Sequence, residues 1–260
     1  MPQSWRIPTL TKALIFDMDG TLTLARQKLT KSVEQELRRL CSKYKMYLVT
    51  GSNYAKVEEQ MGLDVLLEAF DKVFCCNGTV VYNTSLDPDD EFGALEPEMI
   101  HKVDLTDHYS QADLNHIISV LLKYAAKNHT KYKTGTFVEW RGSQINFSLI
   151  GRNCTSEQRE DYVKWDKKSG DRDKAIEFLE TEFKGYGLSF RKGGQISIDI
   201  TRLGWDKTYA LNNISEQPDD CVFFGDNIVP YGNDWEIAAK CGKHHAVESP
   251  DDLLEIFKTY

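Results

Sequence analysis

Residues 13–21 have the sequence ALIFDMDGT, in which four apolar residues run directly into two acids and a glycine. This pattern predicts a buried β-strand that ends in a loop. The strand would deliver the carboxylates of Asp17 and Asp19 to the carboxyl edge of a sheet, where open α/β sheets bind their ligands. An acid in that place holds Mg²⁺ through oxygen atoms or attacks phosphorus to form an aspartyl-phosphate. A turn with two solvated acids is the structural alternative.

Strand and helix signals alternate over the first 86 residues. Short apolar runs at 46–49 and 73–76 predict two further strands. Thr30 has the position of a helix N-cap before the first run, and Val57 and Met61 fall on one face of a helix between the two. Alternation of this kind predicts right-handed crossovers and a parallel sheet.

The pattern changes after the acidic stretch at 87–91, where we expect a linker. Paired helices and paired strands follow, which indicates an antiparallel α+β module inserted into the first domain. We therefore expect a Rossmann-like α/β core over 1–86 and 206–260, with an α+β cap over 87–205. The expected cap elements are a helix around 114–125, strands at 136–140 and 146–150, helices at 156–167 and 172–183, and strands at 188–191 and 195–200.

Composition excludes several classes of protein. The chain has 260 residues and a formal net charge of −8, so it has no basic surplus for general binding of nucleic acid. No segment approaches the ~18 consecutive apolar residues of a membrane span, and the first residues lack the hydrophobic stretch of a signal peptide. The six cysteines form no Cys-x-x-Cys pair, which favours buried free thiols in a reducing cytoplasm over a zinc site.

Three more groups extend the Asp17 loop into a chemical constellation. Asp226 follows the apolar strand expected at 221–224, and a third carboxylate suits the few protein oxygens that Mg²⁺ takes. Thr50, just past the second strand, is placed to hydrogen-bond a phosphoryl group, and Lys207 to neutralise developing charge. Residues 232–234 add polar groups to the same loop. Each group taken alone also has a structural alternative. Asp226 could be an ordinary loop acid, Thr50 a helix N-cap and Lys207 an exposed lysine.

These motifs resemble those of the phosphotransferases of the haloacid dehalogenase (HAD) superfamily. The inserted module is similar to that of the eukaryotic-type phosphomannomutases, and the likeness runs from about residue 12 to the C-terminus, apart from a longer linker around 84–100. It implies a HAD core with an α+β cap that mediates a homodimer. The stretches that carry it are GTFVEWR at 135–141, IGRNC at 150–154, GGQISID at 193–199, GWDK at 204–207 and PYGND at 230–234.

The resemblance also implies roles for individual residues. Asp17 would be the nucleophile and Asp19 the general acid/base, with Thr50 and Lys207 beside them. Mg²⁺ would be bound by Asp17, by Asp19 through its carbonyl, and by Asp226. Glucose 1,6-bisphosphate or mannose 1,6-bisphosphate would act as activator. The residues that would contact the hexose phosphate are Arg26, Arg141, Arg152, Ser197 and Asp199.

Strand periodicity offers independent support for part of this set. In the strand expected at 195–200, the isoleucines point to one face, and Ser197 and Asp199 to the other, side by side on an open face. A half-buried strand with a polar solvent side explains the alternation equally well. For Arg141 and Arg152 the alternative is surface charge, although a guanidinium group suits bidentate capture of phosphate.

The chain departs from the family at Thr134, where an arginine is expected, and Lys131 and Lys133 are nearby candidates to replace it. The favoured function is interconversion of mannose 1-phosphate and mannose 6-phosphate. A HAD sugar-phosphate phosphatase that uses the same Asp17 is the first alternative, because water competes for an aspartyl-phosphate. A non-catalytic sugar-phosphate-binding protein is the second.

Overall fold

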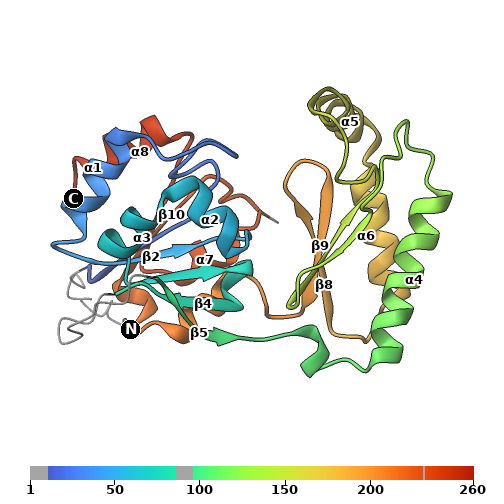
Figure 1. Ribbon diagram of the computed structural model, residues 1–260, viewed down its shortest axis with the longest axis horizontal. Coiled ribbons are helices and arrows are strands. Elements are labelled where there is room, and N and C mark those ends of the chain that lie inside the picture. Colours follow the sequence, from blue (N-terminus) through green and yellow to red (C-terminus); the bar gives the residue numbers. More distant parts are fainter. Residues whose placement is uncertain (1–10, 86–95, 231) are drawn as a thin grey trace, which may run out of the picture. The chain divides into compact units, whose positions relative to one another are not determined.

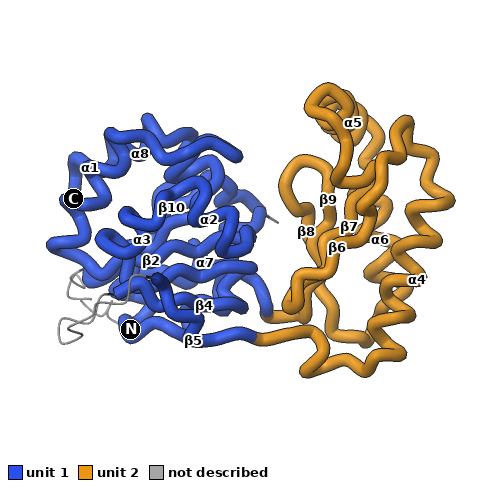
Figure 2. Tube along the Cα trace, in the orientation of Figure 1, with its two compact units in different colours: residues 1–102, 205–260 blue, residues 103–204 orange. Residues whose placement is uncertain are grey.

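The computed structural model describes residues 11–85, 96–230 and 232–260. The chain divides into two compact units, residues 1–102 with 205–260 (unit 1) and residues 103–204 (unit 2), shown in Figure 2. The linker expected at 87–91 lies outside the described residues. Among the helices within the described ranges, none combines the length and apolar character that crossing a membrane requires.

Unit 1 is built on a seven-stranded sheet (Figure 1). β1 pairs in parallel with a strand on each side, so that Phe16 lies beside both Leu48 and Phe224. The last two strands of the sheet pair antiparallel. In sheet order the strands are β11 (Lys243–Ala246), β10 (Cys221–Gly225), β1 (Ala13–Phe16), β2 (Lys45–Val49), β3 (Lys72–Cys75), β4 (Val80–Asn83) and β5 (Glu98–Lys102).

Both faces of this sheet are covered. Leu14 and Phe16 pack in one apolar cluster, and Ala13 and Ile15 in a second on the opposite face, which explains why β1 is apolar throughout. Thr30 caps the first helix as expected, accepting a hydrogen bond from the Val33 amide. The helices of unit 1 are α1 (Lys31–Leu40), α2 (Tyr54–Met61), α3 (Leu63–Ala69), α7 (Trp235–Lys240) and α8 (Pro250–Phe257), with short 3₁₀ helices at Cys76–Gly78, Lys207–Asn213 and Pro218–Asp220.

Unit 2 has a four-stranded antiparallel sheet. Alternation along its strands buries Ile145, Phe147, Ile198 and Ile200 on the face that also packs against α6. The opposite face carries the polar residues between them. In sheet order the strands are β6 (Val138–Trp140), β7 (Gln144–Ser148), β9 (Ser197–Arg202) and β8 (Leu188–Gly193), and the helices are α4 (Gln111–Lys127), α5 (Ser156–Ser169) and α6 (Asp171–Glu182), with a 3₁₀ helix at Leu105–Asp107.

Several features differ from the sequence expectation. We expected the cap to begin at residue 87, but β5 pairs with β4 in the core sheet, so the described residues 96–102 belong to unit 1. The strand expected at 195–200 begins at Ser197, because Gly194 adopts a positive φ of 52° and the chain turns there before entering β9. β4, β5 and β11 were not expected.

Candidate active site

Asp17 occupies the first position after β1 and is only 4% exposed. Its amide donates to the carbonyl of Phe224 at 2.9 Å. This hydrogen bond continues the β1–β10 ladder and fixes Asp17 at the carboxyl end of the central strands. The Thr21 hydroxyl lies 3.5 Å from Oδ2 of Asp17. Gly20 has a φ of 96°, and a Cβ there would collide with the carboxylate of Asp226. A glycine at this turn therefore allows the two acidic loops to approach each other.

Lys207 lies between two carboxylates. Its ammonium nitrogen is 2.5 Å from Oδ1 of Asp17 and 2.5 Å from Oδ1 of Asp234, and all three side chains are buried. Burial raises the pKa of Asp17 to about 7, although the charge of Lys207 opposes this. Burial opposes protonation of Lys207, but Asp17 and Asp234 outweigh it and raise the lysine pKa. The site therefore keeps a fixed positive charge against the carboxylate.

Carboxylate oxygens of Asp17, Asp226 and Asp234 lie within 4.8 Å of one another. Three hard oxygen donors at this spacing fit Mg²⁺. The sequence had indicated Asp17 and Asp226, but Asp234 was noted only as a polar group of the loop and not as a ligand. Asp234 lies eight residues after Asp226, and this spacing alone did not indicate that the Asp234 carboxylate contacts Lys207.

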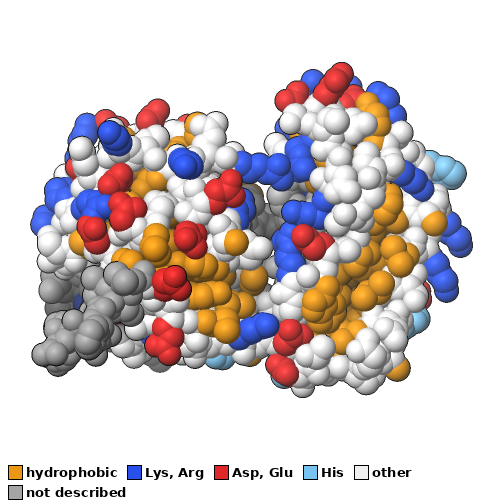
Figure 3. Space-filling view, viewed as in Figure 1, with side chains coloured by type: hydrophobic (Ala, Val, Ile, Leu, Met, Phe, Trp, Pro, Cys, Tyr) orange, Lys and Arg blue, Asp and Glu red, His pale blue; other side chains and the backbone are white. Residues whose placement is uncertain are grey.

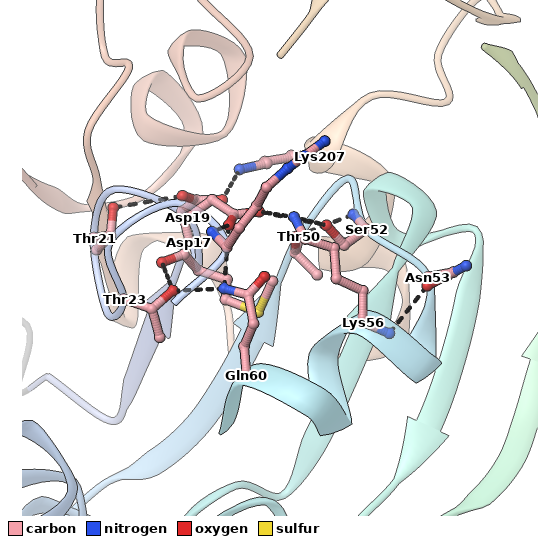
Figure 4. Close-up of polar contacts among 12 residues, drawn as sticks. Asp17, Asp19, Thr21, Thr23, Thr50, Ser52, Asn53, Lys56, Gln60 and Lys207 are labelled. Atoms are coloured by element: carbon pink, nitrogen blue, oxygen red, sulfur yellow. Dashed lines mark hydrogen bonds and ion pairs between the residues drawn. The ribbon is translucent and has the colours of Figure 1, made fainter. Parts of the chain in front are cut away.

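Asp19 is held by side chains from α2 and from the loop before it (Figure 4). Oδ2 of Asp19 lies 2.5 Å from the Lys56 ammonium and 3.5 Å from the Ser52 hydroxyl, and Oδ1 accepts from the Gln60 amide at 3.2 Å. The backbone amide of Arg26 donates to Oδ1 at 3.3 Å. Burial raises the pKa of Asp19, but Lys56 and the other donors outweigh it and lower the pKa overall.

Ser52, Lys56 and Gln60 were not expected at the site. They are spaced by four residues, which on a helix places polar side chains on one face, and this spacing was the available signal. The Arg26 side chain itself is exposed. Thr50 is buried at the end of β2, and its hydroxyl accepts a hydrogen bond from the Ser52 amide at 3.1 Å.

The other expected substrate contacts lie on the polar face of the unit 2 sheet. Arg141 and Arg152 meet at the carboxylate of Glu139, with nitrogen–oxygen distances of 2.5 Å and 3.2 Å. Arg152 also donates to Oδ1 of Asn146 at 2.8 Å, and the Asn146 amide donates to Oδ1 of Asp199 at 2.6 Å. These groups form one connected polar network across β6, β7 and β9.

The expectation of an open face is only partly correct. Asp199 is partly exposed, but Ser197 is 3% exposed because β9 is paired on both sides and its neighbours cover it. Burial raises the pKa of Asp199, opposed by the Asn146 hydrogen bond and by Arg141. Glu139 and Asn146 were not expected, although Glu139 lies two residues from Arg141 and so on the same face of the chain.

Thr134 has a local role in the backbone. Its amide and its hydroxyl both donate to the carbonyl of Ile150, at 2.9 Å and 3.0 Å. Lys131 pairs with Asp161 at 2.7 Å, and Lys133 donates to the last carbonyls of α4. Both lysines are thus engaged elsewhere in unit 2, and neither replaces the expected arginine in this structure.

Comparison with known proteins agrees with this geometry. A family model described as eukaryotic phosphomannomutase matches residues 33–260. Phosphomannomutase 1 of Mus musculus is 40% identical over 244 residues, covering 93% of this chain and 88% of that protein. The phosphomannomutase of Saccharomyces cerevisiae is 36% identical over 245 residues, covering 94% of this chain and 91% of its own length.

Solved structures support the fold. A haloacid dehalogenase-like hydrolase from Bacteroides thetaiotaomicron aligns with a TM-score of 0.60 at 12% identity, covering 95% of this chain and 98% of that one. At this identity the likeness concerns the fold alone, and it agrees with a Rossmann-like HAD core and a cap. The family model and the relatives show that the chain belongs to the eukaryotic phosphomannomutase family.

Proposed function

We propose that the chain is a cytoplasmic phosphomannomutase that interconverts mannose 1-phosphate and mannose 6-phosphate through an aspartyl-phosphate on Asp17. The observation that carries the mechanism is the buried pair of Asp17 and Lys207, 2.5 Å apart at the carboxyl end of β1. A carboxylate in this position is a nucleophile for phosphorus, and the fixed ammonium stabilises the charge of the transferring group.

In the first half of the reaction, an oxygen of Asp17 attacks one phosphorus atom of glucose 1,6-bisphosphate or mannose 1,6-bisphosphate. The bond from phosphorus to the sugar oxygen breaks, and Asp19 donates a proton to that oxygen. In the second half, Asp19 removes a proton from a hydroxyl of the hexose monophosphate, and this oxygen takes the phosphoryl group from Asp17. Lys56 and Gln60 support the base half of this role, because their hydrogen bonds hold the Asp19 carboxylate in place and lower its pKa.

Asp17, Asp226 and Asp234 would hold Mg²⁺, with the carbonyl of Asp19 as a further ligand. The ion would supply positive charge to the oxygens of the transferring phosphoryl group. The spacing of the three carboxylates and the oxygen-only donor set support this assignment.

Unit 2 would bind the end of the hexose phosphate that does not react. Arg141 and Arg152 would bind its phosphate, with Ser197 and Asp199 at the sugar hydroxyls. In unit 1, Arg26 on the Asp17 loop would also contact the hexose phosphate. The convergence of two guanidinium groups on one carboxylate supports an anion site there. Because either end of the sugar reacts in turn, this site must accept both of its phosphates.

We further propose that unit 2 mediates a homodimer. Leu122 on α4 and Phe178 on α6 are 48% and 40% exposed, and the Phe178 ring lies 5.0 Å from that of Tyr124. Figure 3 shows apolar side chains gathered on the visible side of unit 2. Apolar side chains shared between two helices in this way suit a partner surface. Leu122→Glu should convert a dimer to a monomer in sedimentation analysis, whereas Leu24→Glu in unit 1 should not.

The test of the proposed function is incubation with mannose 1-phosphate, Mg²⁺ and glucose 1,6-bisphosphate, with mannose 6-phosphate and free phosphate measured together. We expect mannose 6-phosphate to form well in excess of free phosphate. Release of phosphate without mannose 6-phosphate would indicate the phosphatase alternative. Formation of neither product, with binding of mannose 1-phosphate retained, would indicate a non-catalytic binding protein.

A further inference from the structure

The carboxylate of Glu139 occupies the point where the two arginines of unit 2 converge. Its Oε2 atom accepts hydrogen bonds from Nε and Nη2 of Arg141, at 2.8 Å and 2.5 Å. Nε of Arg152 lies 3.2 Å from the same oxygen atom. A single oxygen surrounded by nitrogen atoms of two guanidinium groups has the surroundings that a phosphate oxygen takes between two arginines.

The four charged groups joined at this point balance one another without a ligand. Arg141 and Arg152 carry two positive charges, and Glu139 and Asp199 can carry two negative ones. Asp199 is linked to Arg152 through Asn146, which joins them by hydrogen bonds of 2.8 Å and 2.6 Å. A phosphate dianion that reaches the arginines therefore meets a group with no net positive charge while Glu139 remains ionised and in contact.

The side chains are accessible enough for an exchange of anions. The side chain of Glu139 is 37% exposed, and those of Arg141 and Arg152 are 20% and 31% exposed. An ion pair at this exposure is weak, because water and salt screen it. A dianion from solvent can thus replace the carboxylate without first opening a buried contact.

We propose that Glu139 is a positioning residue that occupies the phosphate place on Arg141 and Arg152 and is displaced when the sugar phosphate binds. This inference rests on the proposed role of both arginines as phosphate ligands. Glu139 holds the two guanidinium groups converged between substrates, and after displacement its negative charge stays near the bound phosphate and weakens its binding. Weaker binding suits a site that must release one end of the hexose and take the other.

The test uses the full-length Glu139→Gln variant. Its affinity for mannose 1-phosphate is measured by calorimetry in the absence of Mg²⁺ and compared with that of the parent protein. Glutamine keeps the shape of the side chain and removes its charge. Removing one negative charge beside a dianion at a partly exposed site should tighten binding about tenfold, and added salt should reduce the gain. KM should fall with the dissociation constant, whereas kcat should not increase.

Glu180→Gln is the matched control, because it makes the same change on an exposed position of α6, which packs on the opposite face of the sheet. It should leave affinity unchanged. Unchanged or weaker binding in Glu139→Gln would overturn the proposal, since a residue that only orients the arginines would weaken binding when altered.

Arginine variants separate this inference from the proposed function. If Arg141→Ala and Arg152→Ala bind mannose 1-phosphate as the parent does, the phosphate site itself is wrong. If both weaken binding but Glu139→Gln does not tighten it, only the inference about Glu139 fails. The gain from Glu139→Gln should also disappear in the Arg141→Ala background, because binding at any other anion site would be unaffected by that change.

Discussion

The ammonium nitrogen of Lys207 lies 2.5 Å from Oδ1 of Asp17, and the two side chains are 1% and 6% exposed. A buried pair of this kind gains little net stability over an apolar one, but removal of one partner leaves an unpaired charge. Here the loss of the lysine would leave two carboxylates, because Asp234 also depends on Lys207. The arrangement makes the same lysine important for folding and for charge stabilisation.

Lys207→Met should therefore lower the free energy of unfolding by about 3–5 kcal/mol near pH 7.5. The loss should be smaller at pH 5, because Asp17, whose pKa is raised to about 7 even beside Lys207, is protonated at that pH and is no longer an unpaired charge. Urea denaturation at both pH values measures it. Lys12→Met removes an exposed pair with Asp220, in which Lys12 is 58% exposed, and should cost less than about 1 kcal/mol. Equal losses in the two variants would contradict the prediction.

Asp17→Asn should abolish turnover and yet make the metal-free protein more stable at pH 8. Burial raises the pKa of Asp17 from 3.8 to about 7, so the folded protein binds this proton more tightly than the unfolded chain. The resulting stability is fully present below pH 3.8 and is lost as the pH rises towards 7. The variant has no such loss. The difference in stability between Asp17→Asn and the parent protein should therefore grow in favour of the variant from pH 4 to pH 7 and then level off.

Thermal melts in EDTA across this range check the prediction. Asp161→Asn, on an exposed side chain of unit 2, is the control and should show no such trend towards higher stability. An advantage of Asp17→Asn that is the same at pH 4 and pH 8 would mean that the titration of Asp17 does not affect stability.

The strand and loop around Asp17 were predicted correctly from the sequence. β1 is buried on both faces and is therefore a continuous apolar run, and such a run followed by Asp and Gly is typical of a buried strand that ends in a loop. Residues 98–102 were assigned to the cap because the acidic stretch at 87–91 was interpreted as the linker. β5 itself was not recognised, because it lies at the edge of the sheet and is mostly exposed, so it has no apolar alternation. Edge strands are recognisable from their partner strand more than from their own residues.

The side-chain contacts made by loop residues could not be predicted from the sequence. Asp234 and Arg152 reach Lys207 and Glu139 through turns whose paths depend on the register of the strands around them. Glu139 and Arg141 are two residues apart, so strand periodicity could have indicated a shared face for them, although Glu139 was not expected at the site. It could not show that Arg152 would join them at one oxygen atom.

Binding of Mg²⁺ should depend on pH and on Asp226. A proton and the metal compete for Asp17, so apparent Mg²⁺ affinity should rise as the pH increases through about 7 and level off above it. Asp226→Ala should weaken Mg²⁺ binding, whereas Asp219→Ala, in the short helix before β10, should not. Titration calorimetry at pH 6 and pH 8 measures both effects. An affinity that does not change in Asp226→Ala would remove this residue from the metal site.

Lys56→Met tests whether the contact between Lys56 and the Asp19 carboxylate matters for catalysis. Lys56 makes the shortest contact to the Asp19 carboxylate, 2.5 Å, and it is supported by a hydrogen bond to Ser52 at 3.1 Å. Without it, Asp19 keeps the weaker contacts from Gln60 and the Arg26 amide, and its proton-transfer geometry is less well defined. Small displacements of a reacting group are costly, so kcat should fall roughly tenfold to a hundredfold.

KM should change little in Lys56→Met, because the phosphate ligands proposed in unit 2 are intact. Lys56→Arg, which keeps a cation at the same place, should restore part of kcat, and a purely structural role would not predict this rescue. Lys43→Met removes an exposed lysine that donates to the Tyr260 carbonyl and should leave both constants unchanged. If kcat of Lys56→Met equals that of the parent, the remaining donors suffice to position Asp19 and the lysine has no part in proton transfer.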